Sequence, residues 1–219
     1  MEIEFQGLQL KGDLHGQIHK SSCNTYFSYL YQMGSDRFTI DEDGNVTQFV
    51  FKCHTPTSDP ISAQQARATA EEFAAKIFDI SLYDVSVKDN GVYYEIEFRK
   101  YIGSFASTDH ATIGVDYTGK LFSYSAHMLG RVPLSTKVDD IQMDAVESAV
   151  TGKLDEIFAE EKELYQSVEY SNFRYQITTL ADGSRAMICL VDVHCYLEVA
   201  PDVVGRRGEL ISLVIILPQ

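Results

Sequence analysis

The sequence predicts an α+β fold of two units, each a helix followed by an antiparallel meander of strands, with a β-hairpin ahead of the first unit. Apolar residues recur at helical spacing in two stretches of the chain, and segments rich in β-branched and aromatic residues follow each stretch. The same helix-to-strand order thus appears twice. We divide the chain into an N-terminal strand and hairpin segment (1–55), a first unit (56–134) and a second, divergent unit (135–219).

The N-terminal segment is predicted to contain strands joined by turns. Apolar residues recur from Ile3 to Leu10, as expected for a half-buried strand. A polar, glycine-containing stretch at residues 11–22 favours a loop, and two prolines within residues 54–60 indicate a linker. Between them lies a hairpin pattern, formed by two strands and their turn: Arg37–Ile40, Asp41–Gly44 and Val46–Lys52.

The first unit opens with a predicted helix. Ser62 and Gln65 have the spacing of a capping box, in which each side chain bonds a free backbone N–H at the start of a helix. The apolar stripe of this helix is Ala66, Ala70, Phe73, Ala74, Ile77 and Phe78. Four strands are expected to follow: Val85–Val87, Tyr93–Tyr101, Ala111–Asp116 and Leu121–Ala126. Asn90-Gly91 is a strong hairpin signal between the first two, because both residues tolerate positive φ.

The second unit repeats this pattern less closely. A helix is expected from about Asp140 to Glu161, with Gln142 in the place of the capping serine. Its apolar residues align with those of the first helix: Ile141, Val146, Val150, Ile157 and Phe158 with Ile61, Ala66, Ala70, Ile77 and Phe78. Three strands follow: Tyr170–Leu180, Arg185–Leu197 and Glu209–Leu217. By position, Asp182-Gly183 matches the turn at Asn90-Gly91, and Arg207–Leu210 matches the turn at Thr118–Leu121.

The first unit resembles the PepSY-like domains, in particular the tandem repeats of YcdB/YcdC-type proteins. Three stretches carry the resemblance: ISAQQARATAEEF (Ile61–Phe73), VYYEIEF (Val92–Phe98) and IGVDYTGKLFSY (Ile113–Tyr124). It is good over Pro60–Ala126, weaker over Asp139–Leu217, and limited to the final hairpin over Arg37–Lys52.

The resemblance implies a helix packed on an antiparallel sheet, and it supplies no catalytic residues. PepSY-like domains occur in propeptides of secreted peptidases and in bacterial cell-envelope proteins. The resemblance therefore implies a non-catalytic interaction or regulatory module of the cell envelope, which inhibits a peptidase or regulates a sensor. The extracytoplasmic regulators of sensor kinases of the YycH/YycI type are similar in architecture.

Composition narrows the class of partner and leaves the location open. The formal charge is −14, with 18 Lys and Arg against 32 Asp and Glu, so binding to nucleic acid or to anionic lipid is not expected. No apolar run reaches the ~20 residues of a membrane-spanning helix, and the first five residues do not resemble a signal peptide. The partner is expected to be another protein, a peptidase or an envelope sensor component. An extracytoplasmic or membrane-anchored ectodomain is expected if the sequence is a truncated piece, and a cytoplasmic protein otherwise.

Residues able to bind a metal are scattered. His15, His19 and Cys23 are spaced by four, which would place them on one face of a helix, and Cys53 and His54 could complete a site. Gly12 and Gly16 argue against a helix there, so surface and core positions are the preferred interpretation. Cys23 and Cys53 can form a disulfide only if the fold brings them together, and Cys189 and Cys195 would lie about 20 Å apart along one strand.

Three further groups invite a catalytic interpretation, and each has a simpler one. His194 and Cys195, beside Asp192, would point to opposite faces of a strand and so could not pair as neighbours. Asp109-His110 is expected in a solvated loop. The charge runs Asp139-Asp140 and Glu160–Glu163 suit the two ends of the second helix.

We therefore predict no catalytic, cofactor-binding or metal-binding residue, and no cofactor. An exposed sheet edge is the feature expected to bind a partner, because an extended peptide can add to it as a further strand. Two alternatives remain open: an enzyme whose site is assembled from loops, and a binder of small molecules or envelope polymers that uses a tyrosine-lined sheet face.

Overall fold

The computed structural model describes residues 1–20, 26–53, 59–127, 132, 133, 136, 138, 141–180, 182–200 and 203–217. Within these ranges the backbone alone is described at 18–20, 26, 27, 198–200, 203 and 204. The chain divides into two compact units: Met1–Tyr101 with Ser107–Pro133, and Ile102–Ala106 with Leu134–Gln219. Each is described by itself, and the predicted three-part division of the chain stays a prediction.

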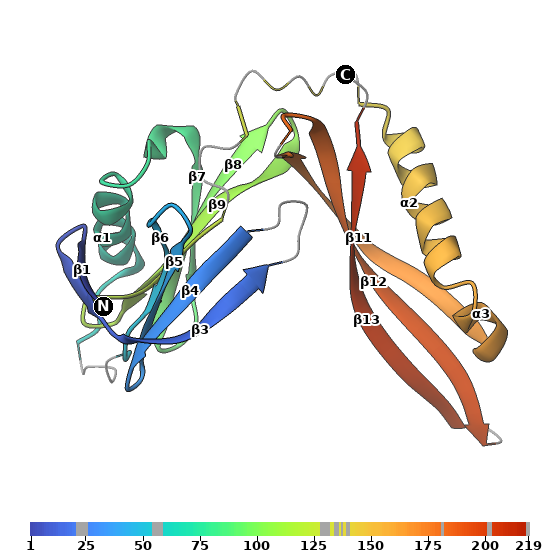
Figure 1. The fold of residues 1–219 in the computed structure, drawn as a ribbon, viewed down its shortest axis with the longest axis horizontal. Helices are drawn as coiled ribbons and strands as arrows, with labels where there is room; N and C mark the ends of the chain where they lie inside the picture. The colour runs from blue at the N-terminus through green and yellow to red at the C-terminus, as the bar shows by residue number, and fades with distance from the viewer. Residues whose placement is uncertain are drawn as a thin grey trace. The chain divides into compact units, whose positions relative to one another are not determined.

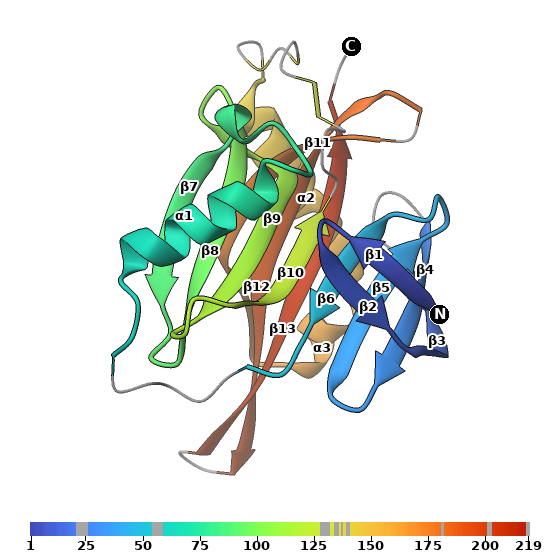
Figure 2. The ribbon, with the colours of Figure 1, turned by 90° about the vertical axis from the view of Figure 1, so that its left-hand side faces the viewer.

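The first unit contains most of the strands. Its elements are β1 (Glu2–Phe5), β2 (Leu8–Lys11), β3 (Asp13–Lys20), β4 (Tyr26–Met33), β5 (Asp36–Asp41), β6 (Val46–Val50), α1 (Ala63–Ala74), η1 (Ile80–Leu82), β7 (Asp84–Asp89), β8 (Tyr93–Ile102), β9 (Phe105–Asp116) and β10 (Leu121–His127). Hydrogen bonds order eight of these strands as β3-β4-β5-β6-β10-β9-β8-β7, and β1 and β2 form a separate hairpin. Figure 2 shows α1 and the β1–β2 hairpin on the same side of this sheet.

Four aromatic rings hold these layers together. Phe5 of β1, Phe49 of β6, Phe73 of α1 and Tyr124 of β10 pack with ring centroids 5.7 to 6.5 Å apart. Such offset and edge-on pairs add attraction beyond the burial of apolar area. The hairpin, the helix and the sheet therefore share one core. Four residues of the predicted stripe are buried in α1, whereas Ile77 and Phe78 follow the helix and are partly buried against the same core.

The second unit is a three-stranded antiparallel sheet with helices on one face (Figure 1). Its elements are α2 (Met143–Ile157), α3 (Glu161–Leu164), β11 (Ser167–Thr179), β12 (Arg185–Ala200) and β13 (Val203–Ile216). Alternate residues of β12, from Met187 to Cys195, are buried on the side of α2. The helix contributes Val146, Val150 and Leu154 to the same core. Gln142 provides no side-chain cap, in contrast to Ser62.

The predicted fold class is wrong. Among the described residues, strands make up 56% and helices 18%, so this part of the chain is mostly β and is not a pair of helix-plus-meander α+β units. Two segments account for much of the difference. Residues expected to form a loop, within 11–22, include strand β3, and Asp109-His110 lies inside β9. The N-terminal hairpin does not precede the first meander as a separate element, because β6 pairs with β10 in the same sheet.

The internal repeat also needs correction. Arg207–Leu210, expected to form a turn, lies within β13. The turns that share a geometry are those at Gly44, Gly119 and Gly183, where the glycine N–H bonds the carbonyl three residues earlier and φ is 84° to 89°. Asp182-Gly183 therefore corresponds to Thr118-Gly119, and not to Asn90-Gly91. Its second backbone bond, from the Leu180 N–H to the Ser184 carbonyl, matches that from Asp116 to Lys120.

No helix in the described ranges is long and apolar enough to cross a membrane.

The capping box of α1 offers a test of local stability. The Ser62 hydroxyl accepts from the Gln65 N–H at 3.3 Å, and the Gln65 side chain accepts from the Ser62 N–H at 2.9 Å. We expect Ser62→Ala to lower the free energy of unfolding of the first unit by about 1 kcal/mol, because the Gln65 backbone N–H loses its acceptor. Urea denaturation measures this. Gln64→Ala, at an exposed position of the same turn, is the control, and equal losses in the two variants would contradict the prediction.

Candidate functional site

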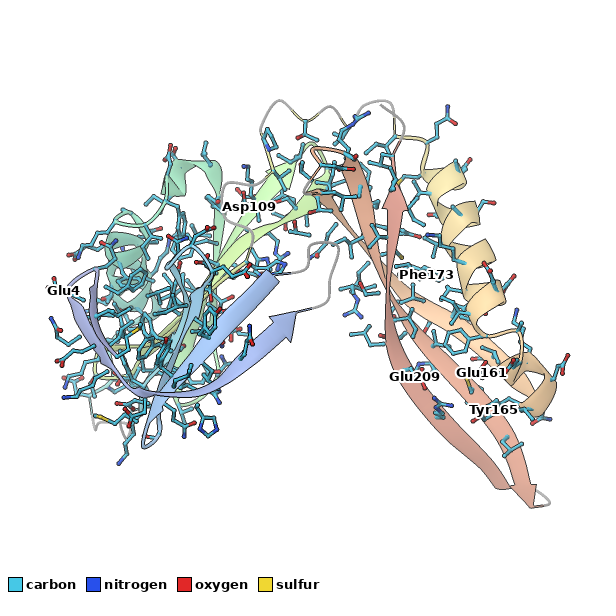
Figure 3. The ribbon with its side chains drawn as sticks, in the orientation of Figure 1. Glu4, Asp109, Glu161, Tyr165, Phe173 and Glu209 are labelled. Carbon is cyan, nitrogen blue, oxygen red and sulfur yellow. The ribbon has the colours of Figure 1, made fainter. Side chains whose placement is uncertain are left out.

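Asp109, predicted to lie in a solvated loop, is fully buried in β9 beside the buried Lys100 of β8 (Figure 3). The Lys100 Nζ lies 3.3 Å from the Asp109 Oδ2 and also donates to the Val132 carbonyl. The Tyr83 hydroxyl donates to the Asp109 Oδ1 at 2.6 Å. Buried charges are tolerated when paired and hydrogen-bonded in this way. These contacts make Asp109 part of the interior of the first unit.

His110, the next residue, is half-buried. Its Nδ1 lies 3.0 Å from the Thr108 carbonyl, and its ring centroid lies 5.4 Å from that of His127. Burial lowers the pKa of His110, and this effect exceeds the opposing one of the backbone hydrogen bond. The strand therefore separates the adjacent Asp109 and His110 side chains rather than joining them in one acid–base site.

The residues considered for a metal do not share a helix face. His15 and His19 lie in strand β3, where a rise of about 3.3 Å per residue separates them by roughly 13 Å. Cys53 follows β6 and is partly buried, and burial raises the pKa of its thiol. Cys23 and His54 lie outside the described residues.

Asp192, His194 and Cys195 lie in β12 with different neighbours. Cys195 is buried on the α2 side, and burial raises the pKa of its thiol. His194 faces the other side, within hydrogen-bond distance of Arg206, while Asp192 accepts from Arg174 at 3.1 Å. The structure thus does not bring His194 and Cys195 together. Of the charge runs, Glu160–Glu163 lies at α3, and Asp139-Asp140 falls outside the described residues.

The most open backbone in the second unit belongs to β13, the last strand in the hydrogen-bonded order. The Leu217 N–H donates to the Arg185 carbonyl at 3.0 Å, and the ladder pairs Ile216 with Ala186 and continues residue by residue. Alternate pairs of an antiparallel ladder exchange hydrogen bonds. Odd-numbered residues of β13 such as Leu213 and Ile215 therefore bond β12, and the even-numbered residues direct their N–H and C=O groups away from it.

The outward set consists of Leu210, Ser212, Val214 and Ile216. Lys153 of α2 supports this assignment, because its Nζ donates to the Val214 carbonyl at 3.1 Å from beyond the edge. Leu210 is 60% exposed and Ile216 is 65% exposed. A long, apolar edge strand whose backbone groups point away from its sheet is a template for another strand. We call the backbone groups of Leu210, Ser212, Val214 and Ile216 the β13 edge.

The two halves of β13 differ in their content of charged residues. Its first half carries Arg206, Arg207 and Glu209, and Arg207 pairs with Glu209 (Figure 3). The second half, from Leu210 to Ile216, has no charged residue. Charged side chains on an edge discourage pairing with other chains. The apolar half of β13 is therefore the part suited to receive an additional strand.

The sequence pointed to exposed edges as binding features but not to this edge. It did predict a strand at Glu209–Leu217. The alternation Leu210, Ser212, Val214, Ile216 was available as a signal, but the position of the strand in the sheet depends on pairing between distant segments.

Comparisons with known proteins complete the description. No family model matches the sequence, and no curated protein matches it. Among solved structures, the C-terminal domain of YpeB from Bacillus megaterium is similar, with a TM-score of 0.41 and 11% identity over 89% of this chain and 88% of that one. An uncharacterised protein from Eubacterium rectale ATCC 33656 has a TM-score of 0.39 and 13% identity over 94% of this chain and 74% of that one. The resemblance to PepSY-like domains therefore continues to rest on the sequence.

The buried ion pair of Lys100 and Asp109 gives a prediction for stability. Lys100→Met leaves the Asp109 carboxylate buried without its cation, so we expect a loss of about 3–5 kcal/mol in the free energy of unfolding. The exposed pair of Arg67 and Glu71, at 2.7 Å, is the matched control, and Arg67→Met is expected to cost about 0.5 kcal/mol or less. Chemical denaturation measures both. The double variant Lys100→Met/Asp109→Leu should be more stable than Lys100→Met, and equal effects of the two single variants would refute the assignment.

His110 gives a prediction for pH dependence. Since its pKa is lower in the folded protein than its ordinary value of about 6.5, the unfolded chain binds the proton first as the pH falls. The free energy of unfolding should therefore decrease as the pH falls through about 6.5, and His110→Gln should reduce that decrease. Denaturation between pH 8 and pH 5 measures it. Identical profiles for the wild type and His110→Gln would exclude this role.

Proposed function

We propose that this chain is a non-catalytic protein-binding module that holds an extended segment of a partner protein against the β13 edge. The observation behind the proposal is the outward row of N–H and C=O groups from Leu210 to Ile216. In this row the Val214 carbonyl accepts from Lys153, so a bound strand would have to replace that hydrogen bond. In strand addition, such main-chain groups supply affinity, and pockets for alternate side chains supply specificity. The apolar sequence of this half of β13 supports a partner segment with apolar residues at alternate positions.

The cell-envelope setting belongs to the same proposal and is supported by the sequence resemblance alone. On that basis the partner is a peptidase or a sensor component, which the module inhibits or regulates. The net charge of −14 favours a partner segment without acidic residues, because like charges repel. The enzyme alternative draws no support from Asp109 or Cys195, since both side chains are buried.

A peptide library tests the proposal directly. Phage-displayed decapeptides are selected on the full chain, and the selected peptides are then synthesised and titrated against it by isothermal calorimetry. We expect peptides with apolar residues at every second position, bound one to one. N-methylation at alternate peptide positions should weaken binding about tenfold or more, because each methyl group removes a hydrogen bond to the edge, and N-methylation at the intervening positions should have little effect.

A single edge position provides the matched variants. The Ser212 N–H points away from β12, so Ser212→Pro removes an edge donor without breaking the β12–β13 ladder. We expect Ser212→Pro to weaken peptide binding at least tenfold and Ser212→Ala, which keeps the N–H, to change it by less than about twofold. Equal binding by both variants would overturn the proposal. So would sedimentation showing that the chain alone is a dimer which Ser212→Pro converts to a monomer, because the edge would then pair with a second copy.

A further inference from the structure

A cavity of about 420 Å³ lies beside the C-terminal end of β13. It is formed between the first turns of α2 and the last residues of the strand. The lining includes Ala145 and Ala149 of α2, Ile215 and Leu217 at the end of β13, and also Gln142 and Arg185. Most of these side chains are aliphatic, and the volume is within the range of pockets that hold small ligands.

Side chains of a strand added at the β13 edge would reach this cavity. Ile215 and Leu217 belong to the odd-numbered residues of β13, which are buried on the side of α2, so the cavity lies on the helix side of the sheet. Successive side chains of a strand alternate between the two faces of a sheet. Every second side chain of a strand added at the β13 edge would therefore point to the α2 side.

The helix leaves room for these side chains. Ala145 and Ala149, four residues apart on α2, are exposed and line the cavity. The helix is anchored next to the edge, because Lys153 reaches the Val214 carbonyl. Small residues on the helix thus keep the space beside the end of β13 unfilled.

We propose that this cavity receives one large apolar side chain of the strand bound at the β13 edge, and so selects which segments bind. This inference rests on the proposed function. The lining is aliphatic except at Gln142 and Arg185, so it favours leucine, isoleucine, methionine or phenylalanine, because an unsatisfied polar group is costly against its aliphatic part. Burial of an apolar side chain of this size strengthens binding by about tenfold or more.

The test fills the cavity. Ala149→Leu adds a branched side chain to the lining and keeps a strong helix former, so α2 is retained. Ser148→Leu, at the adjacent exposed position that does not line the cavity, is the matched control. The probe is the strongest peptide from the library, together with the version in which its one large apolar anchor residue is replaced by alanine.

We expect the alanine version to bind the wild-type chain about tenfold or more weakly than the parent peptide. In Ala149→Leu this difference should largely disappear, because the parent peptide loses affinity while the alanine version does not. Ser148→Leu should behave like the wild type. The inference is overturned if Ala149→Leu distinguishes the two peptides as well as the wild type does.

The two proposals fail in different ways. If peptides are sensitive to Ser212→Pro and to N-methylation but not to Ala149→Leu, strand addition stands and the cavity has no role in selection. If the library yields no peptide, or only peptides insensitive to Ser212→Pro, the proposed function fails and the cavity inference falls with it.

Discussion

The register of the β12–β13 ladder is the constraint on which the proposed binding depends. One hydrogen bond, from Leu217 to Arg185, sets the phase of the entire ladder, because antiparallel pairs alternate between bonded and non-bonded. This phase determines which side chains of β13 are buried and which of its backbone groups point away from β12. It places Leu213 and Ile215 under α2, and it leaves the backbone of Ser212 and Val214 facing outward. The register of β12 and β13 therefore sets both the buried face of β13 and the outward direction of the backbone groups at its edge.

The first unit combines an apolar core with a buried ion pair. Its core around Phe49 and Tyr124 is apolar, but beyond α1 the same sheet face continues into Lys100 and Asp109. Those two residues cannot be hydrated there, so their stability depends on each other and on Tyr83. The hydrogen bond between Lys100 and Asp109 constrains the orientation of β8 and β9 as well as their packing, because a hydrogen bond requires a preferred angle between donor and acceptor and an apolar contact does not.

Local signals in the sequence predicted local structure well. The capping box at Ser62, the apolar stripe of α1 and the turn at Gly119 depend on residues a few positions apart, and they are present in the structure. The sequence failed where distant segments decide the outcome. Residues 13–20 look polar, yet they form β3 because Leu14 to Lys20 pair with β4. Asp109 looks like a loop residue, and its contacts with Lys100 and Tyr83 allow it inside a strand.

The candidate site shows the same division between local and long-range information. Apolar residues in 209–217 predict a strand from their own composition, whereas its position at the end of the sheet order is a property of the whole topology. The cavity is even harder to predict from the sequence than the position of the strand. It depends on Ala145 and Ala149 being small where α2 passes the last residues of β13, and alanines on an amphipathic helix do not indicate a cavity in the sequence.

The open edge has a consequence for the behaviour of the protein at high concentration. Two copies approaching through their apolar β13 strands would have both the hydrogen-bonding groups and the side chains to associate. Each copy also carries a net charge of −14, so the approach is opposed by long-range repulsion that added salt screens over about 8 Å at physiological ionic strength. The acidic composition therefore opposes self-association through this edge, and higher salt should weaken that opposition.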